Sequence, residues 1–323
     1  MINRRQMMGM TAALAPVLIA GPARSQSAWP MRPVRLIVPY APGGPTDAVS
    51  RLIADSLSRT WGQQLVIENR GGAGTNIGAD IVAHADPDGY TMLIGTGALA
   101  INRNLYRTLS YDAVADFAPV VYICGFAFFM LVPATSPAQT FKEFIAYARE
   151  RKGKMTFASP GTGSPPHLAG ELLKHLTGIE MTHVPYRGAG PAFADLIAGR
   201  VDMFFGSGTS IEQVKGGKLR ALAFSGTTRS TALPEVPTVV EAGVPGFECS
   251  SWYGFFVPAK TPPAIVANIN AATVKALAEP GIRSRLDQLG YSFGGSSPAE
   301  LAALLKSEID RWAPIIKAAI APQ

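Results

Sequence analysis

Apolar and polar positions along residues 34–95 repeat in the way that short strands and amphipathic helices require. The apolar run at residues 34–38 predicts a strand, and residues 65–68 and 90–95 predict two more. Between the first two, residues 46–61 predict a helix whose apolar positions recur every three or four residues, namely Val49, Leu52, Ile53 and Leu57. A glycine-rich turn and a second helix follow the second strand. This order predicts a mainly parallel sheet flanked by helices.

The same alternation restarts in the middle of the chain. Apolar runs predict further strands at residues 155–158, 182–186, 201–205 and 219–224. Helical spacing predicts helices at residues 141–151, 165–177 and 191–198. The second of these helices has prolines near its start and Gly178 just past its end, which is typical of helix boundaries. We therefore expect a second group of strands and helices.

The C-terminal part adds one more strand and two helices. Residues 252–257 form an apolar, aromatic run, and a helix is expected from residue 261 to about residue 277. Ser297 and Glu300 have the spacing of a capping box that opens a last helix. These helices need a sheet to cover, and the first sheet is the natural candidate.

The chain is therefore expected to form a two-lobed α/β protein with a ligand cleft between the lobes. Two crossings between the lobes are predicted, near residues 120–130 and 246–254. Lobe 1 would comprise residues 28–125 plus 250–323, and lobe 2 residues 126–249. A hinge of two segments is the geometry of a clamshell that closes on its ligand.

The N-terminus has the composition of a targeting signal. Residues 1–27 combine Arg4 and Arg5 with a short apolar stretch and then small residues, so we expect a signal peptide and export by the Sec or the Tat route. No later segment is expected to span a membrane. The densest apolar run, residues 120–132, is too short and is better interpreted as a buried strand.

Composition supports a globular protein with two cores. The chain has 323 residues, of which 47% are hydrophobic and 16% charged. The formal net charge is +6, but no basic run or alternation of basic and aromatic residues occurs. We therefore expect no nucleic-acid partner.

Two matching loops carry the strongest functional signal. Residues 39–47 (PYAPGGPTD) and residues 159–171 (SPGTGSPPHLAGE) each follow a predicted strand and open a predicted helix. We call them the first loop and the second loop. Glycine lets a backbone approach a ligand closely, and the start of a helix attracts an anion. One such loop in each lobe suggests a small carboxylate held between them.

The first loop offers N–H groups at Gly43 and Gly44, and Tyr40 is a further candidate contact. Asp47 has two interpretations. An acid in the first turn of a helix stabilises the helix dipole. Alternatively, Asp47 faces the cleft, where it would order water or pair with an amine of the ligand.

The second loop offers hydroxyl and N–H groups at Ser159, Thr162, Gly163 and Ser164, which can satisfy the oxygens of a desolvated carboxylate. His167 lies one turn into the following helix. It is interpreted either as a histidine on the helix surface or as a group exposed to the cleft.

Residues 183–191 form a third candidate, in which a strand end again precedes a glycine turn and a helix. Tyr186 could supply an aromatic wall and a hydroxyl. Arg187 is either solvated or paired with an acid. Asp202 is either a turn residue or a ligand contact.

Catalytic and cofactor patterns are weak. The sequence has no Gly-x-Ser-x-Gly elbow, no Walker loop and no His-Glu-x-x-His, so we expect no catalytic residue, no metal and no cofactor. Residues 95–100 imitate a dinucleotide fingerprint but lie on the third strand and lack a clear long helix after Ile101. We interpret the segment as a cleft loop, with Thr96 as a candidate contact.

Two cysteines, Cys124 and Cys249, lie near the expected crossings. An exported protein could oxidise them to a disulfide. Alternatively, they are two buried thiols that act as small apolar groups.

Several segments together resemble the solute-binding proteins of tripartite tricarboxylate transporters, also called the Bug family. The resemblance extends over essentially the whole mature chain, and six segments carry it. They are residues 34–47, 68–78, 86–90, 159–171, 184–188 and 251–258. The resemblance implies a type II periplasmic binding protein-like fold, each lobe a mainly parallel sheet flanked by helices.

The resemblance further implies a periplasmic protein that delivers a small organic carboxylate to membrane transporter subunits, with the first and second loops holding the carboxylate partly through water. The family often has Ser, Thr or His where this chain has Ala98 and Leu99. This difference favours a carboxylate with an apolar or aromatic body over a strongly polar one such as citrate.

Other functions share the same sequence features. A periplasmic sensor that presents its ligand to a signalling receptor would use the same cleft. An exported α/β hydrolase is a further alternative, against which the missing nucleophile elbow argues. In each case we expect a monomer.

Overall fold

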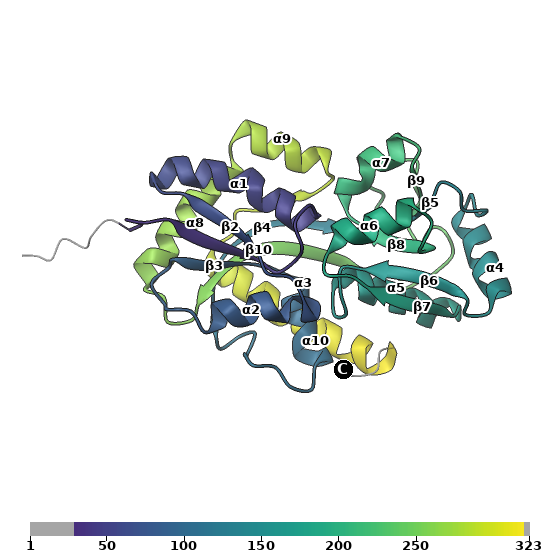
Figure 1. Cartoon of the computed structure of the whole chain (residues 1–323), viewed down its shortest axis with the longest axis horizontal. Coiled ribbons are helices and arrows are strands. Elements are labelled where there is room, and N and C mark those ends of the chain that lie inside the picture. The colour runs from purple at the N-terminus through teal and green to yellow at the C-terminus, as the bar shows by residue number, and fades with distance from the viewer. Residues whose placement is uncertain (1–28, 320–323) are drawn as a thin grey trace, which may run out of the picture.

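A computed structural model of the protein describes residues 29–319, and the leader predicted at residues 1–27 lies outside them. The described elements form two sheets with helices around each (Figure 1). No helix among the described residues is long and apolar enough to cross a membrane.

The larger sheet has six strands in the order β11-β4-β10-β3-β1-β2. Its strands are β1 (Val34–Val38), β2 (Leu65–Asn69), β3 (Thr91–Thr96), β4 (Phe117–Ala127), β10 (Ser250–Pro258) and β11 (Ser292–Phe293). Strand β1 is parallel to β2 and β3, but β10 is antiparallel to both β3 and β4. The sheet is therefore mixed rather than mainly parallel, because the strands that lead to and from the other sheet run in opposite directions.

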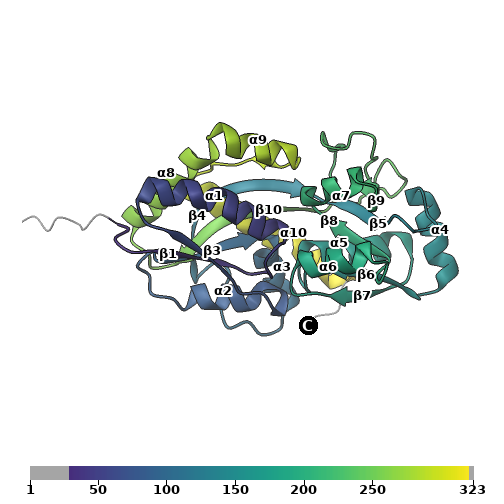
Figure 2. The ribbon, with the colours of Figure 1, turned by 45° about the horizontal axis from the view of Figure 1, so that its top comes forward.

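Helices cover both faces of this sheet, as Figures 1 and 2 show. One layer contains α1 (Pro45–Trp61), α8 (Pro263–Leu277) and α9 (Pro280–Gln288), and the other contains α2 (Asn76–Ala83), α3 (Gly97–Leu105) and α10 (Pro298–Ala319). Alternate residues of β1 face the two layers. Leu36 packs in the same cluster as Ile53 of α1, whereas Ile37 packs with Leu301 of α10.

The smaller sheet has five strands in the order β7-β6-β8-β5-β9 and is also mixed. Its strands are β5 (Phe129–Pro133), β6 (Met155–Ser159), β7 (Met181–Pro185), β8 (Met203–Gly206) and β9 (Leu219–Phe224). The helices around it are α4 (Phe141–Arg151), α5 (Pro165–Thr177), α6 (Ala189–Ile197) and α7 (Ile211–Lys215). Two short 3-10 helices, η1 (Ala73–Thr75) and η2 (Gly208–Ser210), also occur in the described part of the chain.

Phe128 separates β4 from β5, so the apolar run that the sequence suggested as one strand is two strands in different sheets. Ser225 fixes this crossing. Its N–H donates to the Phe128 carbonyl at 2.8 Å, and its hydroxyl accepts from the Phe128 N–H at 2.8 Å. The N–H of Cys249, on the returning segment, donates to the Ser225 carbonyl at 3.1 Å. The two connecting segments are thus bonded to each other through Ser225.

The segment expected as a cleft loop after β3 is instead the nine-residue helix α3. Thr96 caps it, accepting a hydrogen bond from the Ala98 N–H at 3.2 Å. Burial of apolar residues such as Leu99, Ile101 and Leu105 stabilises the rest. The expectation was wrong because these contacts with other elements outweigh the weak local helical pattern.

The two cysteines are free thiols, and both are buried. Burial raises the pKa of each thiol far above its usual value. The Cys249 thiol donates to the Pro165 carbonyl at 3.5 Å. The disulfide alternative is therefore not formed, and the cysteines act as small buried groups.

Candidate functional site

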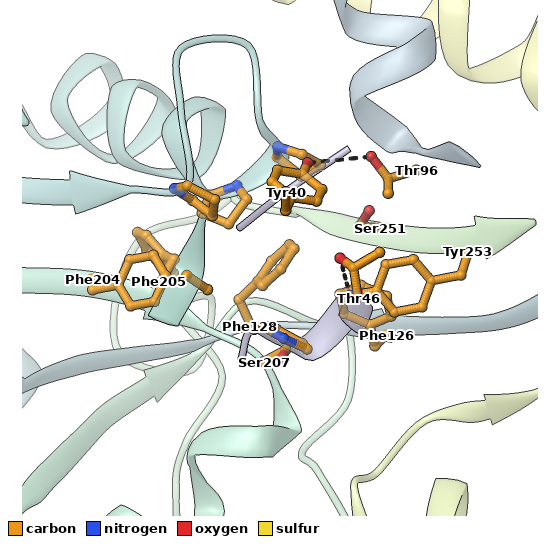
Figure 3. Close-up of a pocket in the computed structure, with 16 residues that line it drawn as sticks. Tyr40, Thr46, Thr96, Phe126, Phe128, Phe204, Phe205, Ser207, Ser251 and Tyr253 are labelled. Atoms are coloured by element: carbon orange, nitrogen blue, oxygen red, sulfur yellow. Dashed lines mark hydrogen bonds between the residues drawn. The ribbon is translucent and has the colours of Figure 1, made fainter. Parts of the chain in front are cut away.

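A small cavity lies where the two sheets meet, and both sheets contribute to it (Figure 3). Its volume is about 40 Å³, far below the roughly 300–1,000 Å³ typical of ligand clefts. The part from the larger sheet and its helices comprises Tyr40, Gly44, Pro45, Thr46, Thr96, Phe126, Ser251 and Tyr253. The remaining lining residues are Phe128, Pro160, Pro165, Pro166, Ala189, Phe204, Phe205 and Ser207. None of them is charged.

The first loop reaches the cavity through the start of α1. Gly44 is the N-cap residue and Pro45 occupies the first helical position, where a missing N–H is no loss. The N–H groups of Thr46 and Asp47 belong to the first turn, which has no intrahelical acceptor, and Gly44 supplies no side-chain cap. The positive end of α1 therefore faces the cavity with open donors.

Hydroxyl groups surround this helix start. The Tyr40 hydroxyl lies 3.4 Å from Oγ1 of Thr96, and the Thr46 hydroxyl donates to the Tyr253 hydroxyl at 3.3 Å. The Ser251 side chain is almost fully buried and has no hydrogen-bond partner within residues 29–319. Burial raises the pKa of Tyr40 to about 12, and that of Tyr253 well above its usual value. Both phenols thus keep their protons and can donate to an anion.

Asp47 holds the first loop together instead of facing the cavity. Its carboxylate accepts hydrogen bonds from the Gly43 N–H at 3.1 Å, from Arg51 at 2.9 Å and from Asn69 at 3.0 Å. Burial opposes the charge, but these bonds outweigh burial and lower the pKa of Asp47. The N–H of Gly43 is consequently occupied, and of the two glycines only Gly44 lines the cavity. The structure therefore contradicts Gly43 as an open N–H donor.

The second loop uses most of its polar groups internally. The Ser159 hydroxyl bonds to the N–H of Gly161 at 3.1 Å, and the Ser164 hydroxyl donates to the Gly161 carbonyl at 2.6 Å. The Gly163 N–H, held at φ +85°, donates to Nδ1 of His167 at 3.2 Å. Ser159, Gly163, Ser164 and His167 do not line the cavity. The second loop reaches it through prolines.

His167 packs inside lobe 2, so neither the surface position nor the cleft position expected for it is found. Its ring centroid lies 4.0 Å from that of His183, whose Nε2 lies 2.6 Å from the Ser159 hydroxyl. Burial lowers the pKa of His167 to about 3 and that of His183 to about 4. Both rings are neutral at neutral pH, and the 3.9 Å approach of His167 to Glu171 is then not an ion pair.

The remaining candidates also lie outside the cavity. Thr162 and Tyr186 line a separate depression between the lobes, with a volume of about 370 Å³. The Tyr186 hydroxyl donates to Asp195 at 2.7 Å. Asp202 accepts from the N–H and the hydroxyl of Thr156, at 2.7 and 3.0 Å, so it is a strand-end contact.

Sequence reasoning missed several lining residues. Phe204 and Phe205 lie at the end of a strand, and Ser207 lies between Gly206 and Gly208 directly after it. A glycine-rich turn after a strand is the same signal as in the first and second loops, so this segment could have been predicted to line the cleft. Ala189 begins α6, at the third glycine turn that the sequence did single out. No local signal marks Phe128, since its position depends on where the chain changes sheets.

Several hydrogen bonds among the described residues join the two lobes. The Ala41 N–H donates to the Arg187 carbonyl at 2.8 Å, and the Tyr106 hydroxyl donates to the Thr162 carbonyl at 3.2 Å. The Tyr291 hydroxyl donates to the Ser207 hydroxyl at 2.9 Å. Among the residues described, no group of three or more His, Cys, Asp and Glu side chains could hold a metal ion.

A family model described as "Tripartite tricarboxylate transporter family receptor" matches residues 49–320. One similar protein, from Pseudomonas sp. strain P51, is described as a "UPF0065 protein in tcbD-tcbE intergenic region". It is 42% identical over 319 residues, which are 98% of this chain and 94% of the relative.

Solved structures are also similar. The periplasmic binding protein BugD has a TM-score of 0.88 at 33% identity, covering 91% of this chain and 100% of BugD. The structure of Rhodopseudomonas palustris Rpa4515 with adipate has a TM-score of 0.88 at 40% identity, covering 91% of this chain and 100% of Rpa4515. The structure of MatC from the same organism, with bound malate, has a TM-score of 0.86 at 36% identity, covering 89% of this chain and 99% of MatC. The motifs, the fold and these matches agree, and the chain belongs to the tripartite tricarboxylate transporter receptor family.

Proposed function

We propose that this protein is a periplasmic solute-binding protein that captures a small organic carboxylate between its lobes and delivers it to a tripartite tricarboxylate-type transporter. The observation that carries the proposal is the cavity shared by both sheets, with the uncapped start of α1 facing it. Open N–H groups, a helix dipole and neutral hydroxyls can replace the water around a carboxylate without a charged partner. Relatives that hold adipate and malate support a carboxylate ligand.

Binding and release require the cavity to open, because about 40 Å³ holds at most a few water molecules. We take the moving parts to be residues 28–125 plus 250–323 and residues 126–249, joined by two segments. The hydrogen bonds from Ala41 and Tyr106 to the opposite lobe would break on opening. Closure of two lobes over a ligand is the hinge motion that this arrangement favours.

We further propose that the protein acts as a monomer without catalytic activity and that the transporter subunits are its membrane partner. Family membership supports a receptor role. The uncharged cavity supports the lack of catalysis, since no carboxylate, histidine, lysine or cysteine is among its lining residues.

Calorimetry and thermal unfolding of ligand-stripped protein with a panel of mono-, di- and tricarboxylates test the proposal. At least one carboxylate should bind and raise the melting temperature, since a ligand at 100 times its Kd stabilises the folded state by about 2.7 kcal/mol. If no member of a broad panel binds, the carboxylate function is wrong.

A matched pair of variants would locate the site. Gly44→Val has an allowed backbone conformation, but its side chain would extend toward Ala189 across the cavity. Gly281→Val introduces the same side chain on α9, where nothing lies within 4 Å of the new Cβ. The first should weaken binding at least tenfold, and the second should leave it unchanged.

A further inference from the structure

The two ends of the cavity differ in chemistry (Figure 3). At one end lie the start of α1 and the hydroxyls of Thr96, Ser251 and Tyr253. The other end is formed by Phe204 and Phe205, and the ring of Phe128 stands between the two ends. A charged group can therefore be solvated at one end, while the other end favours an apolar body.

Helix α5 of lobe 2 cannot supply a second anion site. Helix α5 begins with Pro165 and Pro166, which have no N–H, and both rings line the cavity. Of the preceding loop, the N–H groups of Gly161 and Gly163 already donate to Ser159 and His167. The start of α5 therefore presents carbon to the cavity, whereas the start of α1 presents donors.

The start of α6 faces the same point as the start of α1. A Cβ on Gly44 would lie 3.7 Å from the backbone nitrogen of Ala189 and 3.8 Å from that of Gly190. Two helix starts so close together can surround one carboxylate but cannot separate two. The Ser207 hydroxyl, which lies elsewhere in the cavity, accepts from Tyr291 and lies 3.4 Å from the Thr209 hydroxyl, so it offers at most one donor, its own proton.

From this asymmetry, and on the basis of the proposed function, we infer that the site prefers a monocarboxylate with an aromatic or other apolar body to a dicarboxylate of the same size. A second carboxylate would be buried against Phe128, Phe204 and Phe205 with at most the Ser207 hydroxyl to donate to it, which is strongly unfavourable. An apolar body would instead be buried in contact with Phe128, Phe204 and Phe205.

Matched ligand pairs test the inference by calorimetry on the ligand-stripped protein. Benzoate and terephthalate differ by one carboxylate on the same ring, and hexanoate and adipate differ by one on the same chain length. We expect each monocarboxylate to bind at least tenfold more tightly than its partner. If adipate or terephthalate binds as tightly as its partner or more tightly, the inference is wrong while the proposed carboxylate function stands. If none of the four binds, the inference is also wrong, and the broader panel then decides the function.

A restored N–H group provides a second test. Pro166→Ala returns one first-turn N–H to α5 at the cavity, with little risk to the fold because Ala favours helices. Pro263→Ala makes the same change at the exposed start of α8. Pro166→Ala should shift the adipate-to-hexanoate affinity ratio toward adipate by at least about threefold, and Pro263→Ala should not. An unchanged ratio in Pro166→Ala would contradict the role assigned to the prolines.

Discussion

The first and second loops have the same outline along the chain but differ in which N–H groups stay open at the start of the following helix. Each follows a strand, turns through glycines and enters a helix that begins with proline. In both loops a glycine N–H donates to the side chain four residues later, Gly43 to Asp47 and Gly163 to His167, but the Thr46 N–H in the first turn of α1 stays open. The second loop also bonds its Gly161 N–H to the Ser159 hydroxyl, and α5 begins with two prolines, which have no N–H.

This difference shows that a glycine-rich loop before a helix is not by itself an anion site. What decides is whether nearby side chains leave the N–H groups free, and whether the residues after the N-cap have N–H groups at all. The first loop has the chemistry to hold a ligand. The second loop uses its polar groups for internal hydrogen bonds, and it contributes proline rings to the cavity.

Acid should destabilise the protein through the histidines at the second loop, and it should leave the hydrogen bonds of the first loop intact. Because burial holds the pKa of His167 near 3 and that of His183 near 4, the unfolded chain takes up protons below pH 6.5 that the folded protein refuses. The contribution of these histidines to the free energy of unfolding is therefore fully present above pH 6.5, and it is lost as the pH falls below that value. Between pH 7 and pH 5 the free energy of unfolding should fall by up to about 2 kcal/mol per histidine.

Urea unfolding at pH 7, 6 and 5 measures this effect. Asp47 has a pKa lowered below its usual value, so it keeps its charge over the same range and the first loop stays bonded. His167→Gln removes one titrating ring, and its unfolding free energy should depend less on pH. An equal pH dependence in wild type and variant would show that His167 does not titrate in this way.

Converting the first loop into a copy of the second should remove most of the binding. Thr46→Pro places two prolines at the start of α1, as at the start of α5, and deletes one N–H that faces the cavity. Loss of a hydrogen bond to a charged group costs about 1.5–3 kcal/mol, so carboxylate affinity should fall roughly 10- to 100-fold.

Thr46→Val is the control, since it removes the hydroxyl that donates to Tyr253 but keeps the N–H. Calorimetry should give it a smaller loss of affinity than Thr46→Pro. Equal losses in the two variants would mean that the hydroxyl, and not the helix start, binds the ligand.

Much of the fold could be predicted from the sequence because it depends on local periodicity. The bounds expected for β1, α5 and β9 agree with the structure. Where the expectation was wrong, distant contacts decided. Helix α3 forms through burial against other elements, and the sheets are mixed because the crossing strands run antiparallel to their neighbours. No local pattern reports either effect.

The candidate site was predictable only in part, for the same reason. Tyr40 and Gly44 lie in the loop between β1 and α1, Thr96 ends β3, and all three line the cavity. His167 follows a similar pattern, yet it packs against His183 because β7 lies next to β6. The aromatic end of the cavity requires β8 and the crossing at Phe128 to meet, which depends on strand order.

The smallest expected effect concerns the contact that the second loop does make with lobe 1. The Tyr106 hydroxyl donates to the Thr162 carbonyl at 3.2 Å, and this bond can form only when the lobes are closed. Tyr106→Phe should therefore weaken carboxylate binding by about two- to tenfold, which corresponds to the loss of a hydrogen bond of about 0.5–1.5 kcal/mol. The free energy of unfolding of the ligand-free protein should fall by no more than this amount.

Tyr147→Phe on α4 is the matched control, since it removes a phenol that has no hydrogen-bond partner in the described part of the chain and lies away from the cavity. Calorimetry with the carboxylate that binds wild type most tightly compares the two variants. If Tyr106→Phe binds as tightly as Tyr147→Phe, closure does not depend on the second loop, and its role is reduced to shaping the wall of the cavity.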